Sequence, residues 1–444
     1  MREIISSSAA IENGASGPLH AYQAESGKPP IPYAWSLVLW LWLAHFLNQA
    51  DRQVYSVVLP QLSSELHLSA VQAGLVAGLF TVSLALCVPL AGWAGDRFDR
   101  KQIIVLSLAA WSASTVLSGL ATGIGMLIAV RSVASAAGEA FYTPAAYALM
   151  GSYHSKTRSR AMSLHQTALY VGIISSGFLA GWIADHWGWR QAFLVFGLAG
   201  ILLAGVLKFK LLPAPPPSKV AATERSHFLE AVAMLVRTPT FWWLSLAFGC
   251  LAFVNAGYLT WMPTYLHERF QLSLAKAGFI GMFWHHAAAL GGVMAGGALS
   301  DRMARSKPVR RIDLQGLGLF LGAPFLFLLG QSEGLVSVVM ALIGFGLFRG
   351  LYDSNIYPSL FEVVPQRYHS TASGLMISCA FLFGAIAPVV LGSIKETMGL
   401  AAGFSLLSVV YVIGAVGLWA GGHRCFAADH SRAQAANLIW RTQP

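Results

Sequence analysis

The sequence predicts an all-α membrane protein whose twelve transmembrane helices form two six-helix pseudo-repeats. Of its 444 residues, 56% are hydrophobic and only 11% are charged, too few charges to cover the surface of a soluble chain of this length. Apolar segments of about 20 residues, the length that spans a bilayer, recur between residues 34 and 420. Motifs of the first half of the chain also recur in the second half.

Polar intervals divide the chain into its expected parts. These are a cytoplasmic N-terminal tail (1–33), an N-terminal six-helix bundle (34–211), a cytoplasmic linker (212–239), a C-terminal six-helix bundle (240–420) and a cytoplasmic C-terminal tail (421–444). The first helix is expected from about Trp35 to Pro60, and the twelfth to end near Ala420. The N-terminal tail lacks the basic, apolar and small-residue order of a cleavable signal peptide.

Basic residues predict the orientation of the chain. The loops after the even-numbered helices hold 17 Lys and Arg residues, whereas the opposite loops hold four. Because basic loops remain on the cytoplasmic side, we expect both termini in the cytoplasm and the protein in a bacterial-type inner membrane. This asymmetry accounts for the net charge of +10, so no nucleic-acid partner is expected. We expect a monomer in the lipid bilayer.

The sequence carries no pattern typical of a metal site or of catalysis. Its four cysteines have no metal-type or redox-type spacing. No phosphate-binding loop and no nucleophile elbow occurs between the helices. We therefore expect neither an enzyme nor a resident cofactor.

The loop after the second predicted helix carries the most specific motif. It reads Gly92-x-x-x-Asp96-Arg97-x-Asp99-Arg100-Lys101, and its core recurs 205 residues later as Asp301-Arg302. The motif resembles the signature loop of the major facilitator superfamily, which implies that superfamily's fold, although Asp99 stands where the family has glycine. A glycine permits close helix approach, and an aspartate at a helix end pairs with arginine or with the helix dipole. A gating role is therefore expected for Gly92, Asp96, Arg97, Arg100, Asp301 and Arg302.

A pair of opposite charges interrupts the first predicted helix. Asp51 and Arg52 lie about 15 residues into the span, where ionised groups are rare and usually face a cavity. Adjacent residues diverge by about 100° on a helix, so each side chain needs another partner. The fourth predicted helix supplies Arg131 and Glu139. A carboxylate at this depth can carry a proton through a transport cycle, and the alternative is a purely structural ion pair.

These residues, followed by Pro144, resemble the anion:cation symporter family within the superfamily. The resemblance implies that Asp51 and Glu139 take up protons, that Arg52 contacts a substrate carboxylate, and that Arg131 is a switch partner for the acids. The family spaces the Arg and Glu of this helix by seven residues. The spacing here is eight, which predicts that the two side chains diverge by about 80°. Gly138-Glu139-Ala140 also resembles the Spinster-like lipid transporters.

Other polar and aromatic residues of the spans are candidate substrate contacts. They are His165, Gln166, Tyr170, Tyr258, Trp261, His285, Arg349, Asp353 and Asn355. Each has a structural alternative: histidines and glutamines hold helices together, tryptophan and tyrosine form an interfacial belt, and Arg349 and Asp353 neutralise each other one turn apart.

The sequence thus favours a secondary transporter that works by alternating access. The expected activity is proton-coupled symport of a small organic anion, a sugar acid or related carboxylate, with the proton as coupling ion. The alternative is a Spinster-like, proton-linked transporter of an amphipathic lipid. A drug:proton antiporter is less favoured, because the fifth predicted helix lacks the Gly-Pro pair typical of that group. A ligand sensor would need an added signalling domain.

Overall fold

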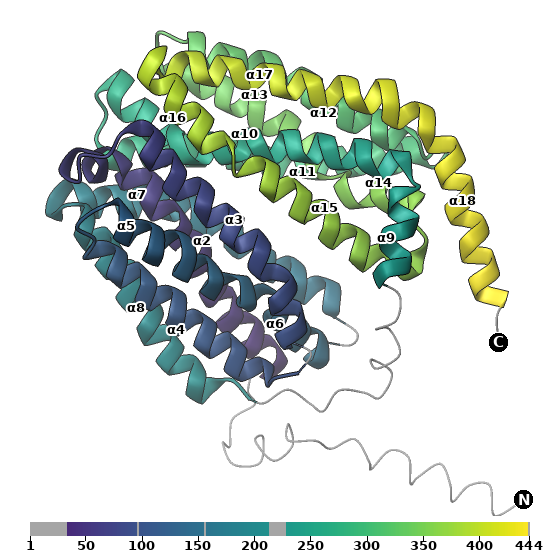
Figure 1. The fold of residues 1–444 in the computed structure, drawn as a ribbon, viewed down its shortest axis with the longest axis horizontal. Helices are drawn as coiled ribbons and strands as arrows, with labels where there is room; N and C mark the ends of the chain where they lie inside the picture. Colours follow the sequence, from purple (N-terminus) through teal and green to yellow (C-terminus); the bar gives the residue numbers. More distant parts are fainter. Residues whose placement is uncertain (1–32, 96, 155–156, 213–227, 443–444) are drawn as a thin grey trace, which may run out of the picture.

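The computed structural model describes residues 33–95, 97–154, 157–212 and 228–442. Helices α2 to α8 form one bundle and α10 to α18 form the other, with α9 between them in the chain (Figure 1). The first bundle holds α2 (Tyr33–Glu65), α3 (Ala70–Gly95), α4 (Arg100–Gly119), α5 (Ile124–Leu127), the π-helix η1 (Ile128–Ser135), α6 (Ala136–Tyr153), α7 (Arg158–Trp187) and α8 (Trp189–Lys210).

The second bundle repeats this plan with more interruptions. Its elements are α10 (Pro239–Phe270), α11 (Leu274–Ala304), α12 (Arg310–Gln331), α13 (Leu335–Asp353), α14 (Ile356–Val363), the 3-10 helix η3 (Gln366–Tyr368), α15 (His369–Gly384), α16 (Ala387–Thr397), α17 (Gly399–Gly417), the π-helix η4 (Leu418–Gly422) and α18 (His423–Thr442). Within the predicted linker, the described residues form α9 (Phe228–Val236). The last helical run continues to Thr442, beyond the predicted end near Ala420.

Ten helical segments of the described chain are long and apolar enough to cross a membrane. Helices α2 and α11 are long enough, but each carries polar residues near its middle, Asp51 and Arg52 in α2 and two histidines in α11. With them, each bundle has six membrane-length helical runs. Many large apolar side chains lie on the outside of the bundles, among them Leu86 and Leu202, which are 63% and 71% exposed. Such a surface suits hydrocarbon rather than water.

The repeat extends to the backbone. The structure places His67 and Gln271 in the left-handed region, with φ of 51° and 50°, at the turns before α3 and α11. Gly188 and Gly399, with φ of 86° and 84°, occupy the turns that follow α7 and α16. The members of these two pairs are 204 and 211 residues apart, so corresponding turns of the two bundles have the same local geometry.

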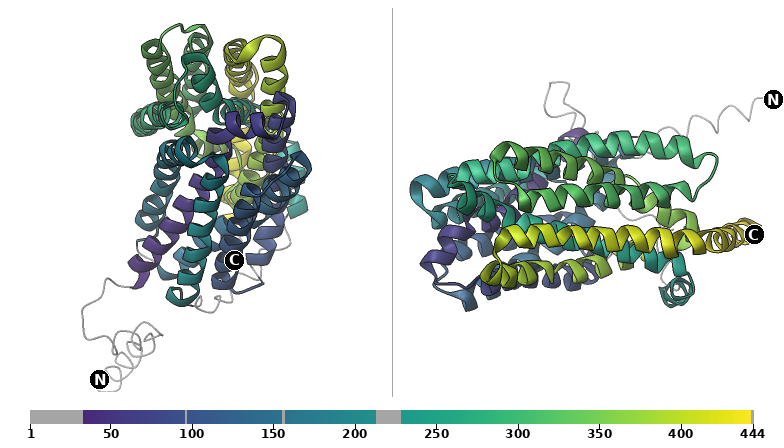
Figure 2. Two further views of the ribbon diagram at one scale, coloured as in Figure 1. Left: turned by 90° about the vertical axis from the view of Figure 1, so that its left-hand side faces the viewer. Right: turned by 90° about the horizontal axis from the view of Figure 1, so that it is seen from above.

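The two bundles meet at one end and spread apart toward the other (Figure 1). They remain separate layers when the molecule is turned by 90° (Figure 2, left). The end at which they meet carries the turns from α2 to α3 and from α10 to α11, and it is called the closed end below. There a Cβ on Gly278 of α11 would collide with the backbone of Gly177 in α7. The helices of opposite bundles are therefore in direct backbone contact.

Candidate functional site

Two arginines and two acids form neighbouring ion pairs inside the first bundle. Asp51 and Arg52 follow each other in α2, so their side chains diverge and find different partners. Arg52 Nε donates to Glu139 Oε2 at 2.5 Å, and Arg131 Nη1 lies 3.6 Å from Asp51 Oδ1. Asp51 and Glu139 are both buried. The structure therefore brings together the four charged residues that the sequence grouped.

Hydroxyl groups complete the coordination of the two acids. Thr115 Oγ1 in α4 donates to Asp51 Oδ2 at 2.5 Å. Ser135 Oγ accepts from Arg131 at 3.4 Å and donates to Glu139 Oε1 at 3.3 Å. Each acid thus has a neutral partner as well as a cation. Such a partner remains available when the acid loses its charge.

The π-helix η1 explains how Arg131 and Glu139 reach the same place. In an α-helix their spacing of eight residues would turn them apart, as the sequence predicted. The i→i+5 bonding of a π-helix widens the turn and absorbs an additional residue. Arg131 Nη2 consequently donates to the carbonyl oxygens of Asp51 and Arg52, both at 3.1 Å, while Glu139 binds the Arg52 side chain. The predicted divergence is wrong.

A cavity of about 180 Å³ lies between the bundles next to this cluster. Arg52 and Arg131 line it from the first bundle, and Asn255 and Thr260 of α10 line it from the second. Phe80 of α3 contributes to the wall, with its ring centre 5.6 Å and 5.2 Å from the two guanidinium carbons. The remaining wall is Gln53, Tyr55, Ser56, Val76, Ala77, Thr81, Leu84, Ala252, Ala256, Leu259, Phe381, Gly384 and Pro388.

The electrostatics of this cavity favour an anion. Among the described residues that line it, two are cationic and none is acidic. Asp51 and Glu139 pair with these arginines but do not themselves line the cavity. The walls are otherwise largely apolar. The cavity therefore suits an anionic group attached to a body with apolar surface.

A second charged cluster lies in the other bundle. Arg349 Nη1 donates to His285 Nε2 at 2.8 Å, and Arg349 Nε lies 3.4 Å from Asp353 Oδ2. A guanidinium has no acceptor, so His285 must accept through Nε2 and is neutral in this arrangement. The ring of Tyr170 in α7 lies 6.4 Å from that of His286, across the interface between the bundles. None of these residues lines the central cavity.

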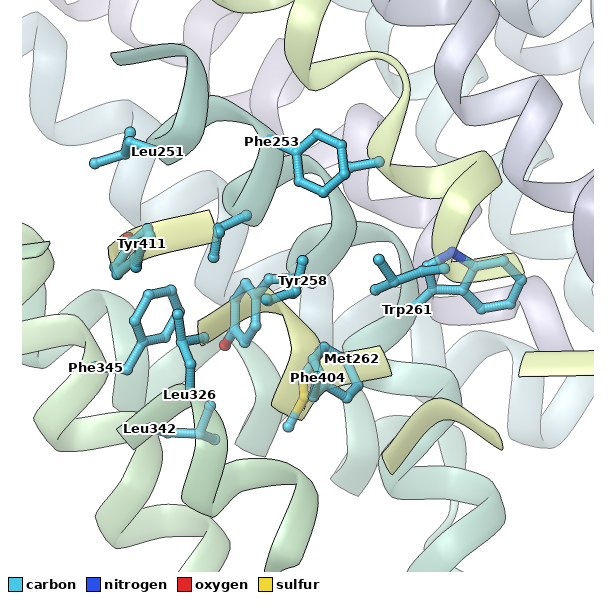
Figure 3. Packing of buried hydrophobic residues seen from close by; sticks show 14 of the residues in the cluster. Leu251, Phe253, Tyr258, Trp261, Met262, Leu326, Leu342, Phe345, Phe404 and Tyr411 are labelled. Atoms are coloured by element: carbon cyan, nitrogen blue, oxygen red, sulfur yellow. The ribbon is translucent and has the colours of Figure 1, made fainter. Parts of the chain in front are cut away.

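Two other predicted substrate contacts, both in α10, bond to backbone carbonyls of their own bundle. Tyr258 donates to the carbonyl of Gly281 and lies among Phe345 and Tyr411 in the core of the second bundle (Figure 3). Trp261 Nε1 donates to the carbonyl of Pro388 at 2.9 Å. In this state neither ring faces the cavity.

Two polar residues of α7 make contacts with side chains of the first bundle, His165 inside the bundle and Gln166 at an exposed position. His165 is completely buried, stacks on His45 with a ring separation of 4.6 Å, and lies 3.2 Å from the hydroxyl of Tyr142. Gln166 accepts from Tyr147 at 2.6 Å. These contacts match the alternative in which polar groups hold helices together.

Asn355 is not part of the Arg349 cluster, although the sequence grouped them. It is completely buried, and its Oδ1 accepts from Ser300 Oγ of α11. Arg311 at the start of α12 donates to Ser300 at 2.8 Å and to Asp301 at 3.2 Å. Asp301 is thus paired with Arg311, and Asn355 belongs to the second copy of the predicted gating loop.

The first copy of that loop is described only in part. Asp96 lies outside the described residues, and Gly92 is described only as a member of α3. Asp99 caps α4 by accepting from the amide of Lys101 at 3.1 Å. Arg100 Nη1 donates to the carbonyl of Ala148 in α6 at 3.4 Å. An aspartate where the family has glycine therefore has a local function as a helix cap.

Four residues of the site were missed by sequence reasoning. They are Phe80, Thr115, Ser135 and Asn255. A lone hydroxyl in an apolar helix usually bonds to its own backbone, so Thr115 and Ser135 gave no distinctive signal. Asn255 gave one, because it is an isolated amide within an apolar run of α10.

Comparison with known proteins agrees with this architecture. The sequence profile of the Major Facilitator Superfamily matches residues 41–388. The chain belongs to the major facilitator superfamily. Members of this superfamily are membrane transporters and not enzymes, so the predicted transporter class is confirmed. The chain is therefore a multi-pass membrane protein that moves a small molecule.

Several relatives share most of the chain. A cis,cis-muconate transport protein from Acinetobacter baylyi is 26% identical over 392 residues, covering 86% of this chain and 92% of the relative. A probable galactarate/D-glucarate transporter from Bacillus subtilis is 26% identical over 397 residues, covering 82% and 86%. A crystal structure of a bacterial homolog of the human lysosomal transporter Spinster, inward-facing and unoccupied, matches with a TM-score of 0.80 and 25% identity, covering 90% and 99%.

Proposed function

We propose that this protein imports a small organic anion, a sugar acid or related carboxylate, together with protons. The observation that carries the proposal is the central cavity, whose described lining holds Arg52 and Arg131 and no acid. A guanidinium binds a carboxylate through two parallel hydrogen bonds. The muconate and galactarate/D-glucarate transporters among the relatives move acids of this chemical class.

Coupling to protons follows from competition for Arg52. In the present arrangement the Arg52 guanidinium is already bound by Glu139 at 2.5 Å. A substrate carboxylate and an ionised Glu139 would compete for the same cation. Protonation of Glu139 removes this competition, so proton binding and anion binding favour each other. Asp51 has the same relation to Arg131, with Thr115 as its neutral partner.

Alternating access supplies the transport step. The cavity lies between the bundles, and the bundles spread apart away from the closed end (Figure 1). The orientation expected from the basic loops places the spread end in the cytoplasm. Rocking of one bundle against the other exposes such a central site to each side in turn.

A gradient-driven uptake assay tests the proposal. The purified protein is reconstituted into liposomes and offered radiolabelled sugar acids, dicarboxylates and monocarboxylates under an inward proton gradient. We expect gradient-stimulated uptake of at least one carboxylate and abolition by a protonophore. No stimulated uptake for any member of the panel would contradict the proposal.

A second candidate is a proton-linked transporter of an amphipathic lipid. The observation in its favour is the largely apolar wall of the cavity, which includes Phe80, Leu84, Leu259 and Phe381. Similarity to the structure of the bacterial Spinster homolog also favours this candidate. A lysolipid that stabilises the protein against heat, and that competes with no carboxylate, would favour this candidate.

A further inference from the structure

At the closed end, each bundle places a carboxylate on the start of a helix in the other bundle. Asp185 near the end of α7 accepts from the backbone amides of Leu274 and Ala275 in α11, at 3.0 Å and 2.9 Å. Glu396 near the end of α16 accepts from the amide of Val71 in α3, at 3.3 Å. These contacts cross between the bundles, and the expected gating motifs include neither acid.

Backbone amides without a partner in their own helix at the starts of α3 and α11 explain why carboxylates bind there. The first amides of a helix have no partner within the helix. Ser273 caps α11 by accepting from the amide of Lys276, and Ser69 does the same for Gln72 in α3. The caps leave earlier amides of each first turn without a local partner. The acid of the other bundle binds amides in that first turn, where the helix dipole also favours negative charge.

The two contacts are equivalent under the internal repeat. Asp185 and Glu396 are 211 residues apart, as are Gly181 and Gly392 and the turn residues Gly188 and Gly399. The caps Ser69 and Ser273 are 204 residues apart, like the two left-handed turn residues before them. Because the two contacts occupy equivalent positions in the two repeats, they form the same structural feature in each bundle.

Close packing restricts this feature to one state of the transporter. A Cβ on Gly181 would collide with the backbone of Leu274, and a Cβ on Gly392 with that of Ala70. The paired helices therefore touch at their backbones beside each carboxylate. When the bundles separate at this end, the amides lose their carboxylate partners and must bind water instead.

We propose that Asp185 and Glu396 form a reciprocal latch that favours closure of this end. Substrate and proton take no part in the latch, so it biases the equilibrium between the two states of the empty protein. Asp185 makes two contacts and Glu396 one, so Asp185 carries the larger share. Both side chains are exposed, and a helix-capping contact of this kind changes an equilibrium by about fivefold.

Distance measurements between spin labels test the latch. The native cysteines are replaced by alanine, and labels are attached at two exposed positions of the closed end, Ser64→Cys in the first bundle and Glu333→Cys in the second. We expect Asp185→Ala to raise the ratio of long to short distances about fivefold, and the double variant with Glu396→Ala to raise it further. Asp185→Asn should retain part of the effect, because its amide oxygen still accepts.

Glu65→Ala is the matched control. Glu65 is a carboxylate at the same end, but it binds Trp189 and Arg190 of its own bundle, at 2.7 Å each. It should leave the distances unchanged. Distances in the double variant equal to those of the wild type and of the control would overturn the latch. Because the labelled protein is measured without substrate or a proton gradient, this outcome is independent of the proposed transport activity.

Discussion

The charges of the first bundle are divided between two ion pairs because Asp51 and Arg52 are neighbours in a helix. Asp51 therefore pairs with Arg131, and Arg52 pairs with Glu139. Two pairs that share a hydroxyl bridge through Ser135 give the site two cations and two protonatable groups within one bonded network.

Replacement of Glu139 by glutamine should separate proton coupling from substrate movement. The amide oxygen still accepts from Arg52, but the side chain no longer binds a proton. We expect accumulation driven by a proton gradient to fall at least tenfold, whereas exchange of labelled for unlabelled substrate stays within about threefold. Glu65→Gln, at the end of α2 and outside the charge cluster, is the control. Equal loss of exchange and of driven uptake would contradict a coupling role.

Replacement of Arg52 should lower substrate affinity more than replacement of Arg349. A hydrogen bond to a charged group contributes about 1.5 to 3 kcal/mol, so Arg52→Ala should weaken carboxylate binding by about 10- to 100-fold. Arg52→Lys keeps the charge but lacks the planar guanidinium, so its carboxylate affinity should lie between those of the wild type and Arg52→Ala. Titration by isothermal calorimetry measures the affinities. A loss of affinity in Arg349→Ala alone would move the substrate site to the second cluster.

Asn255 lies on the wall of the cavity opposite the arginines, so a charge placed there tests whether the ligand is an anion. Its Oδ1 has no hydrogen-bond partner in the structure, and the residue lines the cavity across from the arginines. Asn255→Asp would place a negative charge against an anion, so affinity should fall by at least about tenfold, whereas Asn255→Ala should cost less. Unchanged binding of carboxylates by the aspartate variant would contradict an anion at this position.

At the scale of elements, the π-helix η1 positions the arginine of the fourth span. Arg131 and Glu139 were both predicted from the sequence, but with the wrong geometry, because regular α-helical periodicity cannot anticipate a local i→i+5 turn. The same limit applies to Thr115, whose contact with Asp51 depends on how two helices pack. By contrast, the importance of the charged residues of α2 could be predicted from the sequence, because ionised residues are rare in membrane helices and usually face a cavity.

Deletion of Ala134 tests the account of η1. Ala134 is an exposed residue inside the π-helix, and its removal leaves a spacing of seven, which a regular α-helix places on one face. We expect a folded protein with a melting temperature close to that of the wild type and with transport retained. Deletion of Ala109, inside the regular helix α4, should instead rotate all following residues and abolish folding. Equal damage from both deletions would contradict the account.

At the scale of the whole molecule, the sequence was most informative where two halves repeat each other. Composition, the length of the apolar segments and the Asp-Arg motifs predicted the paired bundles, and the structure and the family match confirm them. The contacts of Asp185 and Glu396 were not predicted, because a helix start in one bundle and an acid in the other meet only in a particular conformation. Contacts that form in only one conformation produce little recognisable pattern in the local hydrophobic periodicity of the sequence.

The central claim, that anion and proton move together, is tested most directly by substrate-driven proton entry. Liposomes that contain the protein and an internal pH indicator receive a transported carboxylate on the outside, with no imposed gradient. We predict acidification of the interior that depends on the substrate, persists when potassium and valinomycin clamp the voltage, and disappears in Glu139→Gln. Uptake of labelled substrate without any internal acidification would contradict the claim.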